Sequence, residues 1–546
     1  MKLSTLSFAV LTLFGVLALS GCGSDNQQSA PSLATTTKDE ITIPNGSEPE
    51  SLDLHKASDS SSFAIIRQMF VGLVSADEKG ATIPALASEW DSADGKVWTF
   101  KIRDAKWSDD TPITAHDFVY SFQRLTDPNT ASPYSSYLVD AKVANAKQIS
   151  DGKAGVETLG VTAIDDKTLE ITLTDPVPYL PDLLVLPVAY AVPKQAIETH
   201  GDKWLDPANI VVSGAYKLTD WVVNSHIKVE RNPAYFGEVT GNINKATFLP
   251  ITSASTEVNR YNKAGEVEIA AIPSEHLTSI KNELPDEVHS SPKLCTFYLE
   301  YNHAKAPFND VKARQAISMA LDRETIAEKV LGRGERATYQ FTPPAIYNMG
   351  EVSHDWMAMD RSARIEHAKQ LMADAGYSSG NPLKFELLYS TSEAGKRIAT
   401  AAASMLNESF GGSVNVSIIN QEWKTMLDTR RQGKFDTAFA GWCADYNEPS
   451  TFLNVLRSDN SNNSGKYASE TFDRLLDSTL SASLNDNDRM ERYHQAEQLL
   501  DKEAAILPIY TAVSVRLQKP YLQAESLNDP SSNWQIKDWA FSRDAE

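Results

Sequence analysis

A short stretch near the end of the chain, Ala440-Gly441-Trp442-Cys443-Ala444-Asp445-Tyr446-Asn447-Glu448-Pro449, gathers side chains that can recognise a cation. A carboxylate such as Asp445, set beside an indole and a thiol, needs a positively charged partner if the fold removes it from water. The Asn447 and Pro449 that follow are equally typical of a turn, in which an aspartate only bonds nearby backbone. These residues alone leave both interpretations of Asp445 open.

The sequence patterns of common enzyme centres are missing from the chain. Its ten histidines are scattered, and no His-Glu-x-x-His zinc pattern occurs. There is no Gly-x-Ser-x-Gly nucleophile elbow and no glycine-rich phosphate loop ending in Gly-Lys. Gly332-Arg333-Gly334 is an isolated turn, and adjacent acids such as Asp109-Asp110 are typical of a solvated turn. We therefore predict no catalytic residue, no metal and no cofactor, and we expect that the protein is not an enzyme.

The first 22 residues are typical of an export signal. Lys2 precedes an apolar run from Leu6 to Leu19, which is shorter than the about 20 residues that a membrane-spanning helix needs. The run ends in Leu17-Ala18-Leu19-Ser20-Gly21-Cys22, which resembles a bacterial lipobox. We predict a lipoprotein signal peptide at 1–21, a lipid on Cys22 and a polar tether at 22–40. The alternative is an ordinary secretory signal with an incidental cysteine.

Length and charge limit the architecture and the partners. Of 546 residues, roughly 500 remain after the signal and the tether, enough for two or three domains of about 150 residues each. The net charge of −21 disfavours nucleic acid as a partner, because little of the surface could neutralise phosphates. No second long apolar segment occurs, so we expect the lipid alone to hold the protein at a membrane.

Cys295 and Cys443 remain as an even pair once Cys22 carries the lipid. In an exported protein such a pair is predicted to form a disulfide. The loop that it closes, roughly 150 residues, would make it worth about 5 kcal/mol at most in the chain-entropy treatment. Two buried free thiols are the alternative.

Hydrophobic periodicity predicts an α/β chain. The apolar positions of 169–173 and 383–387 alternate with polar ones, as in half-buried strands. Those of 316–330 recur at helical spacing, and 361–376 is predicted as an amphipathic helix with Gly376 just after its end. We assign all of these positions to core packing, so they support the site without contributing chemistry to it.

Several short motifs, in a fixed order along the chain, resemble those of a known family. They are Trp98-Thr99-Phe100-Lys101-Ile102-Arg103, Trp107-Ser108-Asp109, Pro112 to Phe118, Gly214-Ala215-Tyr216, Pro307-Phe308-Asn309-Asp310-Val311 and Asn420-Gln421-Glu422-Trp423-Lys424. Together with Ala440–Pro449, they resemble the solute-binding proteins of the peptide/nickel class that serve ABC importers, from about Ile41 to the C-terminus. Asp110 stands where that class usually has glycine, and we expect this to alter only a turn.

The resemblance implies a two-lobed, periplasmic-binding-protein-like fold with an additional domain on lobe one. The implied ranges are 41–70, 193–294 and 511–546 for lobe one, 71–192 for the additional domain and 295–510 for lobe two. The ligand would lie between the lobes, which close around it as hinged bodies. Closure requires a ligand that prefers the closed state over the open one.

The same resemblance implies a site for an extended peptide. Asp445 would pair with the peptide's N-terminal ammonium, and Gly441 to Cys443 would bond its main chain as an added strand. Ser58 and Ser60 would form the facing strand on lobe one, in place of the usual Glu and Val; an exposed serine-rich loop is the alternative. The walls of the cleft would be Tyr134, Trp423 and Trp442, although aromatic residues more often belong to a core.

The resemblance implies only one candidate partner for the peptide's C-terminal carboxylate. Family members that hold short peptides have basic residues at three positions that carry none here, namely Leu331, Gly395 and Phe439. Arg430 does match the family and could bind a carboxylate in a bidentate way. The alternative is that Arg430 and Arg431 form a solvated charge pair.

We therefore expect an exported, lipid-anchored monomer, in the periplasm or on the cell surface, that captures oligopeptides and delivers them to an ABC permease. One alternative keeps the fold and changes the cargo to murein peptides, dipeptides, nickel chelates or haem. Others are an exported hydrolase that uses carboxylates as acid and base, and a sensor that presents its ligand to a membrane receptor. The preferred peptide length and the partner permease do not follow from the sequence.

Overall fold

The computed structural model describes residues 38–77, 80–263, 265–480 and 484–542. The predicted signal peptide, Cys22 and nearly all of the predicted tether lie outside these ranges. Over the described residues, no helix combines the length and the apolar character that crossing a bilayer would require.

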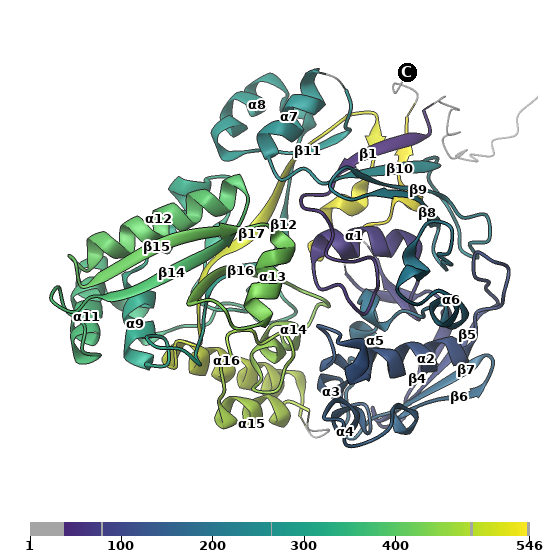
Figure 1. Ribbon diagram of the computed structural model, residues 1–546, viewed down its shortest axis with the longest axis horizontal. Coiled ribbons are helices and arrows are strands. Elements are labelled where there is room, and N and C mark those ends of the chain that lie inside the picture. Colours follow the sequence, from purple (N-terminus) through teal and green to yellow (C-terminus); the bar gives the residue numbers. More distant parts are fainter. Residues whose placement is uncertain (1–37, 78–79, 264, 481–483, 543–546) are drawn as a thin grey trace, which may run out of the picture. The chain divides into compact units, whose positions relative to one another are not determined.

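Lobe one is built on a four-stranded sheet with the order β1-β10-β9-β8. Its strands are β1 (Glu40–Pro44), β10 (Lys245–Leu249), β9 (His226–Arg231) and β8 (Tyr216–Val222). β1 runs parallel to β10, and the other neighbours are antiparallel. Ile41 and Ile43 are buried and alternate with more exposed residues, so β1 turns one face into the core. Helix α1 (Ser60–Met69) packs against β8 of this sheet and lies towards the centre of the protein (Figure 1).

Residues 71–192 form a second antiparallel sheet with the order β4-β5-β7-β6. Its strands are β4 (Ala87–Asp91), β5 (Val97–Ile102), β7 (Thr168–Thr172) and β6 (Val161–Asp165). Helix α2 (Ala115–Thr126) packs against this sheet and begins with a capping box formed by Thr114 and Asp117. Asp110 has a φ of +68°, the left-handed conformation that glycine adopts most readily and that aspartate also tolerates.

Two long strands join lobe one to lobe two. They are β12 (Val288–Tyr301) and β17 (Ile506–Gln518), which pair antiparallel and lie side by side between the two halves (Figure 1). On the side of lobe one, Leu517 packs into a small core, whereas Leu299 and Leu507 pack into the main core of lobe two. The implied domain boundaries at 294/295 and 510/511 therefore fall inside the crossing strands, and the domain ranges themselves stay a prediction.

The crossing strands belong to a sheet with the order β11-β17-β12-β16-β14-β15, with β13 paired to β17; β11 pairs with the lobe-one end of β17, and the other added strands belong to lobe two. The remaining strands are β11 (Ile269–Ala271), β13 (Arg336–Ala337), β14 (Leu383–Ser390), β15 (Val414–Gln421) and β16 (Thr437–Cys443). β14 and β15 are parallel because helix α12 (Glu393–Ser409) carries the chain back between them. Further helices are α9 (Val311–Ala320), α11 (Arg361–Asp374), α13 (Trp423–Arg431), α15 (Glu470–Ser478) and α16 (Asp486–Lys502).

The periodicity predictions are confirmed at the level of elements. The strands predicted at 169–173 and 383–387 correspond to β7 and β14, and the helix at 361–376 to α11, with Gly376 at φ +88° after its end. The helical stripe at 316–330 is interrupted, because the Asp322 side chain accepts a hydrogen bond from a backbone N–H and starts a new helix there. The predicted two-lobed α/β class is thus the one that the protein adopts.

Candidate ligand-binding site

A cavity of about 380 Å³ lies between the two lobes, a volume within the about 300–1,000 Å³ usual for ligand pockets. Lobe one contributes α1 and the loop at 531–534, and lobe two contributes β16 and α13. All nine residues that the resemblance implies as ligand contacts line it: Ser58, Ser60, Tyr134, Trp423, Arg430, Gly441, Trp442, Cys443 and Asp445. The structure thus brings together in one place residues that lie far apart in the sequence.

β16 presents a free strand edge to this cavity. One edge of β16 pairs with β12 along its whole length. The other edge pairs with β14 only at Thr437 and Ala438, and within the described ranges no strand covers it from Phe439 onward. A free edge offers N–H and C=O groups to an added extended chain. Gly441 lies in this part, and a Cβ atom there would meet the Phe297 ring at 2.8 Å, so glycine lets the ring pack beneath the edge.

The carboxyl group of Asp445 lies just beyond the end of this edge. Tyr134 Oη donates to its two oxygens at 3.2 and 3.3 Å, and the Asp445 N–H donates to Thr451 Oγ1 at 2.9 Å. In the part of the chain that the structure describes, no cationic side chain forms an ion pair with Asp445. Burial raises the pKa of Asp445 to about 7, while the Tyr134 hydrogen bond and the charge of Arg67 oppose the rise. The group is therefore a half-buried acid that a cation entering the cavity would ionise.

Aromatic rings flank Asp445 and line the rest of the cavity. The Tyr134 ring lies 6.3 Å from the Trp442 ring and 6.1 Å from the Phe63 ring, measured between centroids. Trp442 Nε1–H donates to the Thr451 carbonyl oxygen at 2.9 Å, which fixes its indole. Trp423 opens α13, and its buried Nε1–H has no acceptor among the described residues, so it is free to meet a ligand.

Arg430 and Arg431 do not form the solvated charge pair considered above, because each has an acid partner. Arg430 Nε lies 2.7 Å from Glu300 Oε2, and both side chains are largely buried. Arg431 pairs with Glu50 and donates to Ser58 Oγ at 2.6 Å, which links lobe two to lobe one. Both arginine charges are therefore balanced before any ligand enters, and the binding of a ligand carboxylate by Arg430 stays a prediction.

Residues 58–60 do not form the strand implied for lobe one. Ser60 is the first residue of α1, because the Asp59 side chain accepts the Ser62 N–H and caps the helix. Ser58 donates its N–H and its hydroxyl to Glu50 Oε2, each at 3.1 Å. Asp59 keeps an extended backbone, with φ −120° and ψ 154°, so main chain that could face a peptide is confined to the residues before the helix.

Cys295 and Cys443 lie opposite each other in the ladder of β12 and β16. Their sulfur atoms are 2.06 Å apart, and the structure pairs them as a disulfide. The pair joins the end of the cavity-lining strand to one of the two crossing strands.

Some cavity residues were missed by the sequence analysis. Ser60, Phe63, Ala64 and Arg67 all line the cavity, and their spacing of three, four and seven residues places them on one face of α1. That helical spacing is the signal that would have revealed Phe63 and Arg67 once Ser60 was assigned to the site. Lys293 lines the cavity from β12, and no local pattern distinguishes it.

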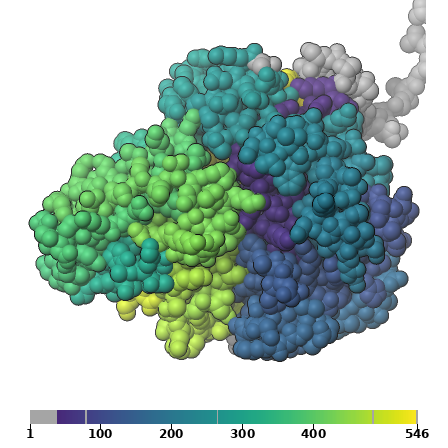
Figure 2. All heavy atoms as spheres, in the orientation of Figure 1, coloured from purple at the N-terminus to yellow at the C-terminus, as the bar shows by residue number. Residues whose placement is uncertain are grey.

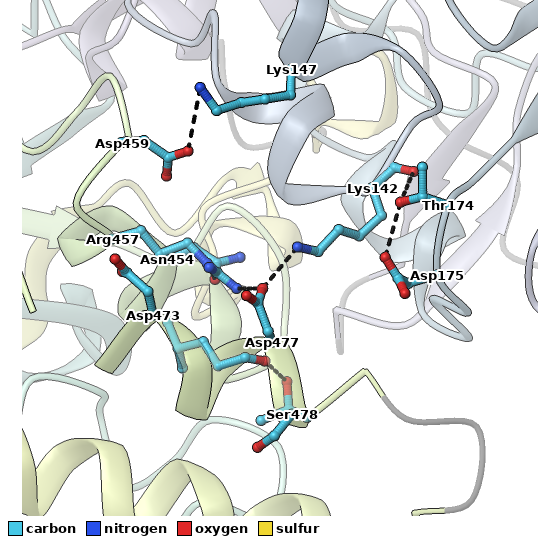
Figure 3. A network of polar contacts seen from close by, with 12 residues as sticks. Lys142, Lys147, Thr174, Asp175, Asn454, Arg457, Asp459, Asp473, Asp477 and Ser478 are labelled. Carbon is cyan, nitrogen blue, oxygen red and sulfur yellow. Dashed lines mark hydrogen bonds and ion pairs between the residues drawn. The ribbon is translucent and has the colours of Figure 1, made fainter. Parts of the chain in front are cut away.

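A second set of polar contacts joins the additional domain to lobe two, outside the cavity. Lys142 Nζ lies 2.9 Å from Asp477 Oδ1 on α15, and Arg457 pairs with the same oxygen at 2.7 Å (Figure 3). Asn460 donates to Asp140 Oδ2 at 2.7 Å, and burial raises the pKa of Asp140 to about 7. Figure 2 shows the yellow-green atoms of lobe two meeting the blue atoms of the additional domain along this contact. The lobes therefore touch on both sides of the cavity.

Known proteins resemble this chain over nearly its whole length. Residues 81–464 match the sequence profile of the bacterial extracellular solute-binding proteins, family 5 Middle. The periplasmic oligopeptide-binding protein OppA of Salmonella typhimurium is 49% identical over 496 residues, which cover 90% of this chain and 91% of that protein. The crystal structure of Haemophilus influenzae OppA in complex with RPPGFSPFR has a TM-score of 0.90 at 40% identity, covering 94% of this chain and 100% of that chain. The Escherichia coli murein tripeptide-binding protein MppA has a TM-score of 0.90 at 39% identity, covering 93% and 99%.

Proposed function

Because the chain belongs to the family 5 bacterial extracellular solute-binding proteins, which are binding proteins and not enzymes, we propose that it captures oligopeptides and delivers them to an ABC importer. The similarity to oligopeptide-binding proteins, one of them solved with a peptide, supports this choice of cargo. The peptide would lie extended along the free edge of β16, enclosed between the lobes.

The observation that carries the proposal is the position of Asp445. It combines a half-buried carboxyl group, no ion-pair partner in the described part of the chain, and a place at the end of a free strand edge. A peptide's N-terminus offers what this site lacks, a compact cation attached to a backbone that can add to the strand. An ammonium that leaves water to enter this cavity gains an anionic partner there, which compensates for its lost hydration.

The remaining cavity residues have complementary proposed roles. Gly441, Trp442 and Cys443 would bond the peptide main chain, which gives affinity without reading side chains. Tyr134 and Trp423 would form walls for the side chains, with Trp442 as a third wall. Ser58 and Ser60 would contact the peptide from lobe one, and Arg430 would reach a carboxylate farther along it.

We further propose the cellular setting that the sequence indicates. Export by the signal at 1–21 would leave Cys22 as a lipidated N-terminus, so that the folded body is held at a membrane while it works in the periplasm or at the cell surface. In that oxidising setting Cys295 and Cys443 would form a stable disulfide. The protein would act as a monomer, with the permease of an ABC importer as its partner.

Titration calorimetry with trialanine and N-acetyl-trialanine tests the proposal. We expect the free-amine peptide to bind and acetylation to weaken it at least thirtyfold, about 2 kcal/mol or more, because Asp445 then loses its cation. Equal affinities would remove Asp445 from this role, and no binding of any peptide would reject the function. Mass spectrometry of the recovered peptide checks that it stays uncleaved, as expected of a receptor.

Murein tripeptide is the second candidate cargo, since the fold matches MppA as well as OppA with a TM-score of 0.90. Native mass spectrometry of freshly purified protein separates these candidates, because an enclosed ligand that survives purification is identified by its mass. A mixture of peptide masses supports a general oligopeptide receptor, and a single murein-derived mass supports the alternative.

A further inference from the structure

The cavity contains two cationic side chains that no acid contacts. Lys293, from β12, and Arg67, from α1, both line it. No carboxylate of the described residues lies within 4.0 Å of either cation, whereas Arg430 pairs with Glu300 and Arg431 with both Glu50 and Asp428. Asp445 acts on Arg67, and Asp529 on both cations, only from a longer range, so neither charge has the close acid partner that the two arginines have.

The surroundings of Lys293 disfavour its charge. The side chain is half-buried, and its Nζ donates to Ser532 Oγ. Burial lowers the pKa of Lys293 to about 8; Asp529 opposes this shift, and the like charge of Arg516 adds to it. Asp529 acts from beyond ion-pair distance, and its oxygens accept backbone N–H groups at 2.9 and 2.8 Å. A carboxylate entering the cavity would supply what Lys293 lacks.

Arg67 shows the same deficit through an unsatisfied donor. Its guanidinium lies 5.8 Å from the centre of the Phe63 ring, and its buried Nε–H has no acceptor among the described residues. Buried donors in folded proteins are nearly always satisfied. An orphaned donor on the wall of a ligand cavity therefore points to a ligand atom, and the acceptor that fits a guanidinium best is a carboxylate oxygen.

Strand register locates Lys293 relative to the proposed ammonium site. Just beyond the ladder of β12 and β16, the Ala444 N–H donates to the Leu294 carbonyl oxygen at 2.8 Å. In this register Lys293 comes opposite Asp445. Lys293 therefore lies at the end of the cavity where the peptide would begin, and Arg67, whose charge opposes the rise in the pKa of Asp445, lies near the same end.

Building on the proposed peptide binding, we propose that Lys293 and Arg67 form a subsite for a carboxylate near the amino end of the bound peptide. The carboxylate has two possible sources, the side chain of a glutamate or aspartate among the first residues, or the C-terminus of a dipeptide. The first source would give the receptor a preference for acidic peptides and the second a preference for dipeptides, and main-chain contacts alone provide neither.

Calorimetry of the full chain at pH 7 tests the subsite with C-terminally amidated tetra-alanine peptides. Glutamate or its neutral isostere glutamine replaces the first, second or third residue in turn, and a second arm compares dialanine with its amide. We expect a preference of about tenfold for the carboxylate in one arm, typical of a charge pair made in a desolvated site. Lys293→Met should reduce it to less than about twofold while the glutamine peptides keep their affinity, and Lys293→Arg should retain it.

Lys424→Met is the matched control, because Lys424 is an exposed lysine beside Trp423 that does not line the cavity. It should leave every affinity unchanged. Equal affinity for glutamate and glutamine at all three positions, together with equal affinity for dialanine and its amide, overturns the subsite. So does a preference that persists in both Lys293→Met and Arg67→Met. Binding of the neutral tetrapeptides keeps the proposed function intact in either case, and a failure of all peptides to bind overturns both proposals.

Discussion

Acidification should weaken peptide binding through a single group, Asp445. In the ligand-free protein burial raises its pKa from 3.8 to about 7, against the lowering effects of the Tyr134 hydroxyl and the Arg67 charge that face it. The proposed ammonium contact requires the ionised carboxylate. Below pH 7 the protein must therefore release a proton from Asp445 when a free-amine peptide binds, and its affinity falls as protons become more abundant.

The size of this effect follows from the ionised fraction. At pH 6 about one tenth of Asp445 is ionised, and at pH 5 about one hundredth, if its pKa is 7. The dissociation constant of trialanine should thus rise about tenfold for each pH unit below 7. Calorimetry from pH 5 to 7.5, repeated in two buffers with different ionisation enthalpies, measures the affinity and the number of protons released in the same experiment.

Two controls test whether Asp445 pairs with the peptide's ammonium. N-acetyl-trialanine and the Asp445→Asn variant should each abolish the pH slope, because one removes the ammonium and the other the titrating acid. The variant should also lose about 2–5 kcal/mol of affinity for trialanine at pH 7.5. A wild-type dissociation constant that stays flat between pH 5 and 7, or the same slope in Asp445→Asn, would show that Asp445 is not the amine's partner.

The ionisation of Asp445 also affects the stability of the folded protein, which falls as the pH rises. A carboxyl group with a pKa of 3.8 when unfolded and about 7 when folded is protonated in both states below pH 3.8, where it costs nothing. As the pH rises from 3.8 to 7 the folded state loses stability, by up to about 4 kcal/mol for the difference of 3.2 pKa units. Saturating peptide, which supplies the missing cation, should therefore raise the melting temperature more at pH 7.5 than at pH 5.

Three further perturbations have defined outcomes. Replacing Cys295 and Cys443 together by serine should lower the free energy of unfolding by about 3–5 kcal/mol, measured by urea denaturation, because the pair closes a long loop; an unchanged midpoint would mean that the thiols are not bridged. Asp477→Asn should speed peptide release about two- to fivefold in stopped-flow measurements, since it removes a partly exposed ion pair between the lobes; an unchanged release rate would exclude this contact from closure. Arg430→Ala should destabilise the protein by about 3–5 kcal/mol by leaving Glu300 buried without its partner, and adding Glu300→Gln should restore much of the loss; equal urea midpoints for wild type and Arg430→Ala would refute this assignment.

Much of the cavity could be predicted because its residues lie on short continuous segments. Gly441, Trp442 and Asp445 belong to one stretch of ten, so a resemblance transfers them together without any knowledge of distances. The even number of remaining cysteines was likewise sufficient to predict the pairing of Cys295 with Cys443, since an exported chain with two such residues has one intramolecular choice.

Other features depend on packing that no local pattern encodes. Glu300 lies 130 residues before Arg430, so the sequence could not show that this arginine is already neutralised. The free edge of β16 exists because β14 stops pairing after Ala438, which is a property of the sheet as a whole. At Ser60 the local signal was present but misjudged, since Asp59, three residues before the buried Ser62 and Phe63, is a helix cap and not part of a strand.

The attachment of β16 to β12 has a mechanical consequence. β12 is one of the two crossing strands about which the lobes would move. The Cys295–Cys443 disulfide attaches β16, the strand proposed to bind the peptide, to β12. If the lobes close about β12 and β17, a peptide on β16 would lie near the hinge, and the Lys142–Asp477 ion pair, which joins the lobes outside the cavity, would break when they open. A membrane partner that contacts the surface around Lys142 and Asp477 would sense whether the lobes are closed without contacting the peptide's side chains. One importer could therefore accept peptides of many sequences.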